Sequence, residues 1–143
     1  MANGSVNTHT TSRQEIENLR ELVNRDLKDA EIDGLSDDRR FATAYNAVLQ
    51  LSKMAIACSG YRVSSNKVGH HRTTFEAVKN AIGSVDVRNL SDYFETCRRK
   101  RNLIDYDATE VASETEANEL VKKGREFQII IEDWISDNYP AYK

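Results

Sequence analysis

The feature that most constrains this chain is its scarcity of residues that interrupt helices. Its 143 residues include one proline, Pro140, and only six glycines, whereas Ala, Leu, Glu, Lys and Arg are frequent. Proline and glycine are the least favourable residues inside a helix, and the frequent residues are among the most favourable. Long helices are therefore expected, without a strand. The composition predicts an all-α fold, an antiparallel four-helix bundle with an additional short helix.

The length of the chain is that of a single domain with one core. Residues 1–11 are polar and rich in Asn, Ser and Thr, which predicts a disordered N-terminal tail followed by one helical domain over residues 12–143. No stretch has the apolar run of a signal peptide or of a membrane span. Cys58 and Cys97 fall on apolar or small faces of expected helices, which favours buried free thiols in a reducing cytosol. We therefore expect a cytoplasmic protein without a membrane partner.

Capping signals place the starts of the helices. A serine or threonine followed three residues later by glutamate can satisfy two free amides of a first helical turn, and this spacing occurs at Ser12–Glu15, Thr73–Glu76 and Ser113–Glu116. Ser36, with two acidic residues after it, is a further cap. The next-to-last helix is expected to begin at Asn89 or Ser91. Residues 60–71 are expected to form a polar loop, which is long for a connection in a small bundle.

One helix carries the main candidate site. The formal net charge is −3, so attraction for nucleic acid would have to come from a local patch. Four consecutive cations, residues 98–101, provide one. With about 100° per residue, a core stripe with Phe94 at its edge lies beside a polar ridge. The stripe contains Leu90, Tyr93, Cys97 and Ile104, and the ridge contains Arg98, Arg101, Asn102 and Asp105.

The ridge allows two interpretations. As a binding site for an anionic ligand, its guanidinium groups would hold phosphate, and Asn102 and Tyr106 would add hydrogen bonds. Alternatively the cations are solvated, and Arg101 forms an ion pair with Asp105 four residues later. Local chemistry alone favours the second interpretation, because charge runs on helices are usually solvated faces.

Two adjacent histidines, His70 and His71, precede the expected cap at Thr73. They could pack on the helix start or contact a loop carbonyl, or they could supply imidazoles to a site elsewhere in space. Adjacent histidines do not face one ligand, and no Cys, Asp or Glu completes a set, so no metal site is predicted. No glycine-rich phosphate loop or other cofactor motif occurs either, and no cofactor is expected.

The Arg101-Asn102 pair, followed by Asp105-Tyr106, resembles the HEPN superfamily. Together with residues 38–47, 60–62 and 69–74, the stretch 98–107 is similar to a branch of small stand-alone bacterial HEPN-like proteins. The likeness covers roughly residues 36–135. It implies a helical homodimer in a toxin–antitoxin or phage-defence setting, with an antitoxin or a nucleotidyltransferase as a possible partner.

Catalytic HEPN proteins are metal-independent ribonucleases in which an Arg, a polar residue and a following His meet across a homodimer interface. Arg101 and Asn102 match the first two positions. Tyr106 stands where the His would be, and no His follows it. A phenol near its usual pKa is a poor base at neutral pH. Whether the chain is an enzyme is therefore open.

Three hypotheses follow. The first is an HEPN-like homodimer that binds RNA or a nucleotide through Arg98, Arg101, Asn102, Asp105 and Tyr106. The second is a non-catalytic module for dimerisation or partner docking, in which Arg101 and Asp105 link subunits. The third is a metal-independent ribonuclease that uses His70 or His71 with Arg101 in place of the missing histidine. The distance between these histidines and Arg101 distinguishes a shared site from separate features.

Overall fold

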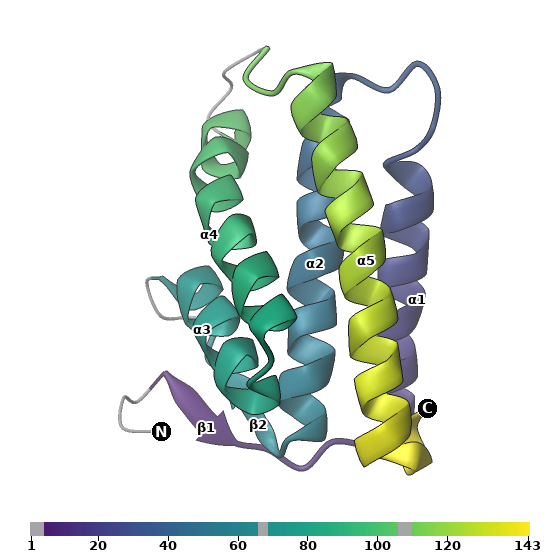
Figure 1. The fold of residues 1–143 in the computed structure, drawn as a ribbon, viewed down its shortest axis with the longest axis vertical. Coiled ribbons are helices and arrows are strands. Elements are labelled where there is room, and N and C mark those ends of the chain that lie inside the picture. The colour runs from purple at the N-terminus through teal and green to yellow at the C-terminus, as the bar shows by residue number, and fades with distance from the viewer. Residues whose placement is uncertain (1–4, 66–68, 106–109) are drawn as a thin grey trace.

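The structure is a computed structural model that describes residues 5–65, 69–105 and 110–143, with the side chain of Asp105 excepted. It is mostly helical, as predicted, and forms a helical bundle (Figure 1). In chain order its elements are β1 (Val6–Thr8), α1 (Arg13–Asp29), α2 (Asp37–Cys58), β2 (Tyr61–Val63), α3 (His70–Ile82), α4 (Val85–Asp105), α5 (Glu114–Asn138) and the short 3-10 helix η1 (Pro140–Tyr142).

Helix α2 lies at the centre of the bundle. It packs against α1 and α5 on one side and against α3 and α4 on the other, and Figure 1 shows the shorter α3 beside α4 at one end of the molecule. Residues on most sides of α2 are buried, from Phe41 to Cys58. Its many alanines, such as Ala44, Ala47 and Ala55, are buried and allow neighbouring backbones to approach closely. The two cysteines are buried free thiols, as predicted.

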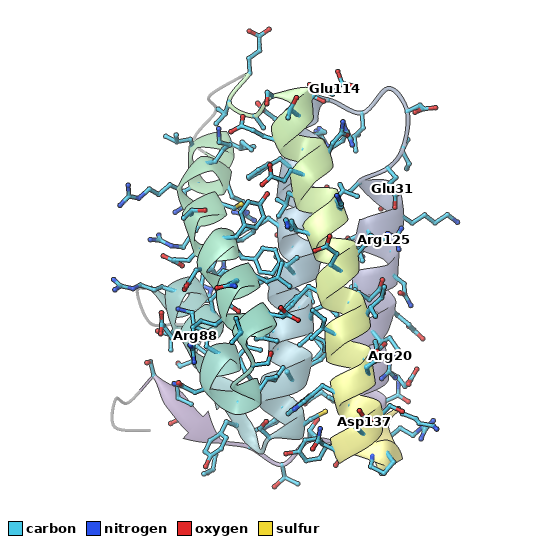
Figure 2. The ribbon with its side chains drawn as sticks, in the orientation of Figure 1. Arg20, Glu31, Arg88, Glu114, Arg125 and Asp137 are labelled. Carbon is cyan, nitrogen blue, oxygen red and sulfur yellow. The ribbon has the colours of Figure 1, made fainter. Side chains whose placement is uncertain are left out.

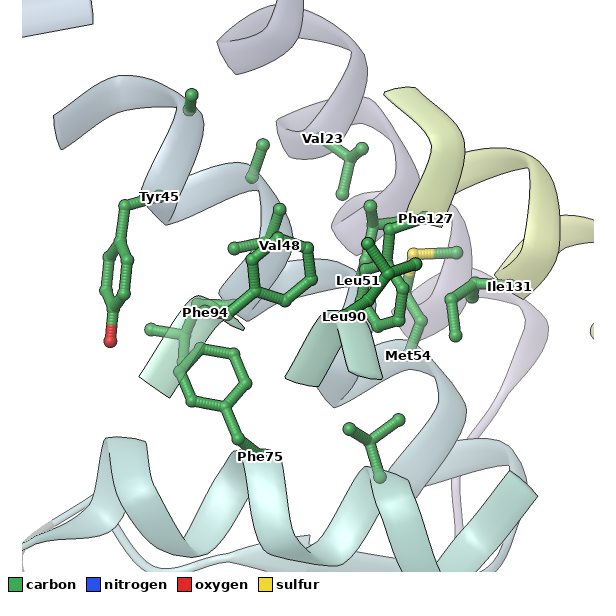
Figure 3. Close-up of a cluster of buried hydrophobic side chains, with 14 of the residues drawn as sticks. Val23, Tyr45, Val48, Leu51, Met54, Phe75, Leu90, Phe94, Phe127 and Ile131 are labelled. Carbon is green, nitrogen blue, oxygen red and sulfur yellow. The ribbon is translucent and has the colours of Figure 1, made fainter. Parts of the chain in front are cut away.

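The core contains a row of aromatic rings that leads toward α3. Phe127 packs edge-on against Phe94 at 5.1 Å between ring centroids, Phe94 lies 6.0 Å from Phe75, and Phe75 lies 5.9 Å from Tyr45. Figure 3 shows Tyr45 at one end of this cluster. Phe94, expected at the edge of the core stripe, is fully buried. The row therefore connects the middle of the core to the Tyr45 hydroxyl.

Charged pairs on the outer surface join α5 to α1 and to the segment that follows α1. Arg20 contacts Glu132, with 2.6 Å between Nε and Oε2, and also donates to the carbonyl of Tyr142. Near the C-terminal end of α1, Arg125 of α5 donates to Glu31, with 3.0 Å between Nε and Oε1. Figure 2 labels Arg20, Arg125 and Glu31 along one side of the molecule. None of the residues in these contacts is a histidine or one of the cations 98–101.

Two predicted helix starts are confirmed and a third carries a full capping box. Ser12 and Ser36 each accept a hydrogen bond from a backbone amide in the first turn of their helix. At Ser113 the side chain accepts from the Glu116 amide, and the Glu116 carboxylate accepts from the Ser113 amide. These caps depend on contacts three residues apart, so the local sequence predicts them well.

The start of α3 is different from the prediction. The helix begins at His70 and not at Thr73, with Gly69 as its N-cap and without a capping side chain. Gly69 has a φ of +78°, in the left-handed region where a side chain is unfavourable. With this backbone conformation at Gly69, the helix starts before the expected cap at Thr73. Both histidines therefore lie in the first turn of α3. Similarly, α4 begins at Val85, ahead of Asn89 and Ser91.

The predicted disordered tail and the predicted absence of strands are wrong for residues 6–8. These residues form β1, which pairs antiparallel with β2 so that Val6 lies opposite Val63. The backbone amide of His9 extends the contact by donating to the Gly60 carbonyl at 2.8 Å. Gly60 has a φ of +94° and follows the end of α2. The extended residues of β2 after it have backbone N–H and C=O groups that need hydrogen-bond partners. Pairing satisfies those groups and buries Val6.

Within the described ranges, none of the helices combines the length and apolar character that a membrane crossing requires.

Candidate functional site

A small cleft lies where the start of α3 meets α4. Its volume is about 170 Å³, and it is lined by Gly69, His70, His71, Arg98 and Asn102. Four of these five residues carry side chains that bind anions or donate hydrogen bonds. The sequence motifs around residues 70 and 100 are thus brought together in space. The expected shared site included Arg101, which is not among the residues that line this cleft.

The cleft opens at the N-terminus of a helix of 13 residues. The first amides of a helix have no acceptor within it, and the helix dipole places partial positive charge there. Gly69, His70 and His71 line the cleft and also form the start of α3, so the cleft lies beside this helix terminus. Helix starts of this kind bind phosphate and other anions.

His71 is held by the buried Tyr45. The Tyr45 hydroxyl lies 3.1 Å from Nδ1 of His71. Burial raises the pKa of Tyr45 well above its ordinary value, so the phenol keeps its proton at neutral pH. A protonated hydroxyl can donate to Nδ1 or accept from it, and the tautomer of His71 decides which. In both tautomers Tyr45 engages Nδ1, and Nε2 is the second nitrogen of the ring.

The charge state of His71 follows from its surroundings. Burial, together with repulsion of a positive charge by the neighbouring His70, Arg101, Lys53 and Arg98, lowers the pKa of His71 to about 4. The ring of His70 lies edge-on to it, with centroids 4.4 Å apart. At neutral pH His71 is therefore uncharged.

Arg98 and Asn102 reach the cleft from α4. They are four residues apart, one helical turn, so their side chains are neighbours on one face. Arg98 is held by Glu95, with 2.8 Å between Nε and Oε1. Among the described residues, no acceptor is in hydrogen-bond contact with the Nη atoms of Arg98 or with the Asn102 amide. Both groups are thus positioned to bind a ligand.

Arg101 does not line the cleft, which corrects the single ridge expected from the sequence. Its Nη2 atom donates to Oδ1 of Asn46 on α2 at 3.3 Å, and its guanidinium carbon lies 5.8 Å from the centroid of the Tyr45 ring. The side chain is partly buried. One residue before Asn102, it points toward α2 because helix α2 covers that side of α4. Its positive charge still acts on His71 through space.

Two predicted ligand-binding groups lie outside what the structure describes. These are the side chain of Asp105 and the whole of Tyr106. The expected ion pair of Arg101 with Asp105 and the expected contact of Asn102 with Tyr106 therefore stay predictions.

Sequence reasoning missed Tyr45 and Glu95. Tyr45 is read from the sequence as a core residue, and its ring is indeed fully buried, but its hydroxyl orients His71. Glu95 positions Arg98, and its Oε2 atom is buried without a hydrogen-bond partner among the described residues. The spacing of Glu95, Arg98 and Asn102, three and then four residues, places them on one helical face. That spacing was a usable signal.

No group of three or more His, Cys, Asp or Glu side chains that could hold a metal ion occurs in the described part of the chain.

Comparison of the chain with protein-family models, with curated proteins and with solved structures finds no match in any of the three. The resemblance to HEPN proteins accordingly rests on the sequence motifs alone, and it stays a prediction.

Proposed function

We propose that this chain binds RNA or a nucleotide by holding a phosphate group in the cleft between α3 and α4. The observation that carries the proposal is the convergence of His70, His71, Arg98 and Asn102 on one small cleft. Guanidinium and imidazole N–H groups are strong partners for phosphate oxygens. The amides at the start of α3 add donors and a favourable dipole.

The size of the cleft supports phosphate as the bound group. A volume of about 170 Å³ corresponds to roughly five or six water molecules at about 30 Å³ each. This space suits a phosphate and is small for a phosphate with its sugar and base. The base would therefore lie outside, so binding depends on the backbone of the nucleic acid more than on its sequence.

The proposal includes the finer features implied by the HEPN resemblance. The chain would be a cytoplasmic, HEPN-like antiparallel four-helix bundle with an additional short helix. It would act as a homodimer in a toxin–antitoxin or phage-defence setting. The support is the set of sequence motifs, together with a mostly helical fold in which two of those motifs line one cleft.

Binding should be measured by fluorescence anisotropy with a short labelled single-stranded RNA. We expect affinity to fall steeply as salt is raised, because phosphate contacts release counterions. Arg98→Ala should weaken binding about tenfold, the effect of losing one hydrogen-bonded charge. Competition with adenosine monophosphate distinguishes RNA from a nucleotide as the ligand. If the nucleotide displaces the RNA, a single nucleotide is enough to occupy the cleft.

Arg99→Ala is the matched control. It removes the same charge from the same helix, but the Arg99 side chain is exposed and does not line the cleft. It should change affinity much less than Arg98→Ala. Equal effects of the two variants would mean that general charge, and not the cleft, attracts the RNA. Unchanged affinity in Arg98→Ala would exclude the cleft as the binding site.

RNA cleavage is a second candidate, favoured by the position of both histidines inside the cleft beside Arg98. Because the pKa of His71 is lowered to about 4 and Tyr45 already contacts its Nδ1, His70 is the histidine we assign to proton transfer. RNA incubated with the protein and a metal chelator should then be cleaved, and His70→Ala should abolish the cleavage. If the RNA stays intact at high protein concentration, cleavage is rejected and RNA binding remains the proposed function.

A further inference from the structure

A second cavity lies on another side of α2, between α1, α2 and strand β2. Its volume is about 330 Å³, and among the described residues it shares no lining residue with the phosphate cleft. Ligand pockets in proteins start at about 300 Å³, so this cavity has room for a small organic molecule. It is lined by His9, Glu15, Leu19, Lys53, Ile56, Ala57, Tyr61, Arg62, Val63 and Ser65.

The notable group in this cavity is the ammonium of Lys53. The side chain is partly buried, and burial lowers the pKa of Lys53 below its ordinary value. Among the described residues, no carboxylate forms an ion pair with it. A dehydrated charge without a counter-charge is unfavourable. A bound anion would supply the missing counter-charge.

The carboxylate in the same cavity is already engaged. Glu15 accepts a hydrogen bond from the Thr11 hydroxyl at 2.8 Å, and Nε2 of His9 lies within 3.0 Å of both of its carboxylate oxygens. Arg62 is close enough to help keep the pKa of Glu15 low. Glu15 is thus held at one side of the cavity by other partners, and Lys53 remains available to an anion.

The remaining walls are largely apolar. Leu19 comes from α1, Ile56 and Ala57 come from α2, and Val63 comes from β2. Ile56 and Ala57 are buried, and Leu19 and Val63 pack partly against the core. Apolar walls with a few polar groups are the usual form of a small-molecule site. Arg62 is a second cation of the lining, but it is exposed and acts on Glu15. The partly buried ammonium of Lys53 is therefore the group that matches one negative charge, and the walls match an aliphatic chain.

We infer that this cavity binds a small aliphatic carboxylate, with the carboxylate on Lys53 and the alkyl chain against Leu19, Ile56 and Val63. The inference does not depend on RNA binding, because the two sites have no described lining residue in common. It assigns the cavity to a monoanion with an apolar body, because the partly buried ammonium of Lys53 is flanked by apolar side chains.

The test is isothermal titration calorimetry of the full chain with octanoate, acetate and 1-octanol. We expect saturable binding of octanoate, with both acetate and 1-octanol at least about tenfold weaker, because each lacks one of the two interactions. Lys53→Met keeps a long apolar side chain without the charge and should weaken octanoate binding about tenfold. Lys28→Met changes an exposed lysine near the end of α1 and should bind octanoate as the wild type does.

Circular dichroism should be used to check that Lys53→Met is folded. Amide chemical shifts of the wild type then locate the bound ligand without any substitution. Octanoate should shift the amides of Ile56, Ala57 and Val63 most, and those of the cleft residues less, because the charge of Lys53 also acts on His71. The inference is overturned if octanoate does not saturate the wild type, or if its largest amide shifts lie away from Ile56, Ala57 and Val63. It is also overturned if Lys53→Met binds octanoate as tightly as Lys28→Met does.

Discussion

At the scale of single residues, neighbouring side chains of one type have different roles. Arg98 and Arg101 stand one turn apart on α4, yet the first lines the cleft and the second donates to Asn46. His71 likewise contacts Tyr45 through Nδ1, and its burial and the cations around it keep its ring neutral, whereas in the described part of the chain His70 makes no hydrogen bond with Tyr45. The surroundings of each side chain, and not its position in a run of charges, determine its role.

His71 should make the protein sensitive to acid. Its pKa is about 4 in the folded chain and near 6.5 when solvated. The unfolded chain therefore binds more protons between these values, and the free energy of unfolding should decrease as the pH falls from 6.5 to 4. We expect a loss on the order of 1 to 2 kcal/mol, since solvent screens a partly exposed ring.

Urea unfolding of the wild type and of His71→Gln across this range checks the prediction. The glutamine carbonyl can still accept the Tyr45 hydrogen bond but does not titrate. The variant should therefore lose less stability than the wild type between pH 6.5 and pH 4. An identical pH dependence in both proteins would assign the acid sensitivity to other groups.

At the scale of the elements, the start of α3 builds the cleft. The helix begins early because Gly69 adopts a φ of +78°, and this places both histidines and the helix amides at the cleft. A helix that began at Thr73 would leave His70 and His71 in a loop. The same helix ends at Gly83, with a similar φ of +72°. The two glycines thus form a matched pair at opposite ends of α3.

Gly69→Ala and Gly83→Ala should each lower the free energy of unfolding by about 1 kcal/mol, because a Cβ disfavours positive φ. Among the residues that the structure describes, nothing lies within 4 Å of either added Cβ, so no clash with them adds to this cost. Only Gly69→Ala should also weaken RNA binding, since it alone disturbs the cleft. Thermal unfolding and RNA anisotropy measure the two effects, and equal binding by both variants would contradict the assigned role of Gly69.

At the scale of the whole molecule, the bundle is organised around close contacts of α2. Helix α5 approaches both α1 and α2 at Gly124, where a Cβ would lie 3.3 Å from Cδ2 of Leu27 and 3.4 Å from Cγ1 of Val48. Leu27 and Val48 are fully buried. The absence of a side chain at this position therefore sets the spacing of three helices.

Enlarging Gly124 should destabilise the bundle. Gly124→Val is expected to lower the free energy of unfolding by about 1 to 3 kcal/mol, because overpacking forces the neighbours apart. Gly124→Ala should cost less, since the better helix propensity of alanine, worth about 1 kcal/mol, opposes the tight contact. Urea unfolding of both variants checks the order. A Gly124→Val variant as stable as the wild type would show that the helices separate freely.

The predictions that succeeded depend on nearby residues. Helix content, the caps at Ser12, Ser36 and Ser113 and the buried thiols all follow from composition and from spacings of three or four residues. Those that failed depend on distant partners or on backbone conformation. Residues 6–8 form a strand because β2 is beside them, and α3 starts early because of the φ of one glycine.

By itself, the sequence determined which residues share a helical face, and therefore that Arg98 and Asn102 are neighbours. It also singled out His70 and His71 as the imidazoles a site would need. Only the tertiary structure decided that these four residues meet and that Arg101 turns toward α2. The physical reason is that spacing along a helix orders its faces, whereas the packing of the other helices decides which face is covered and which is open to a ligand.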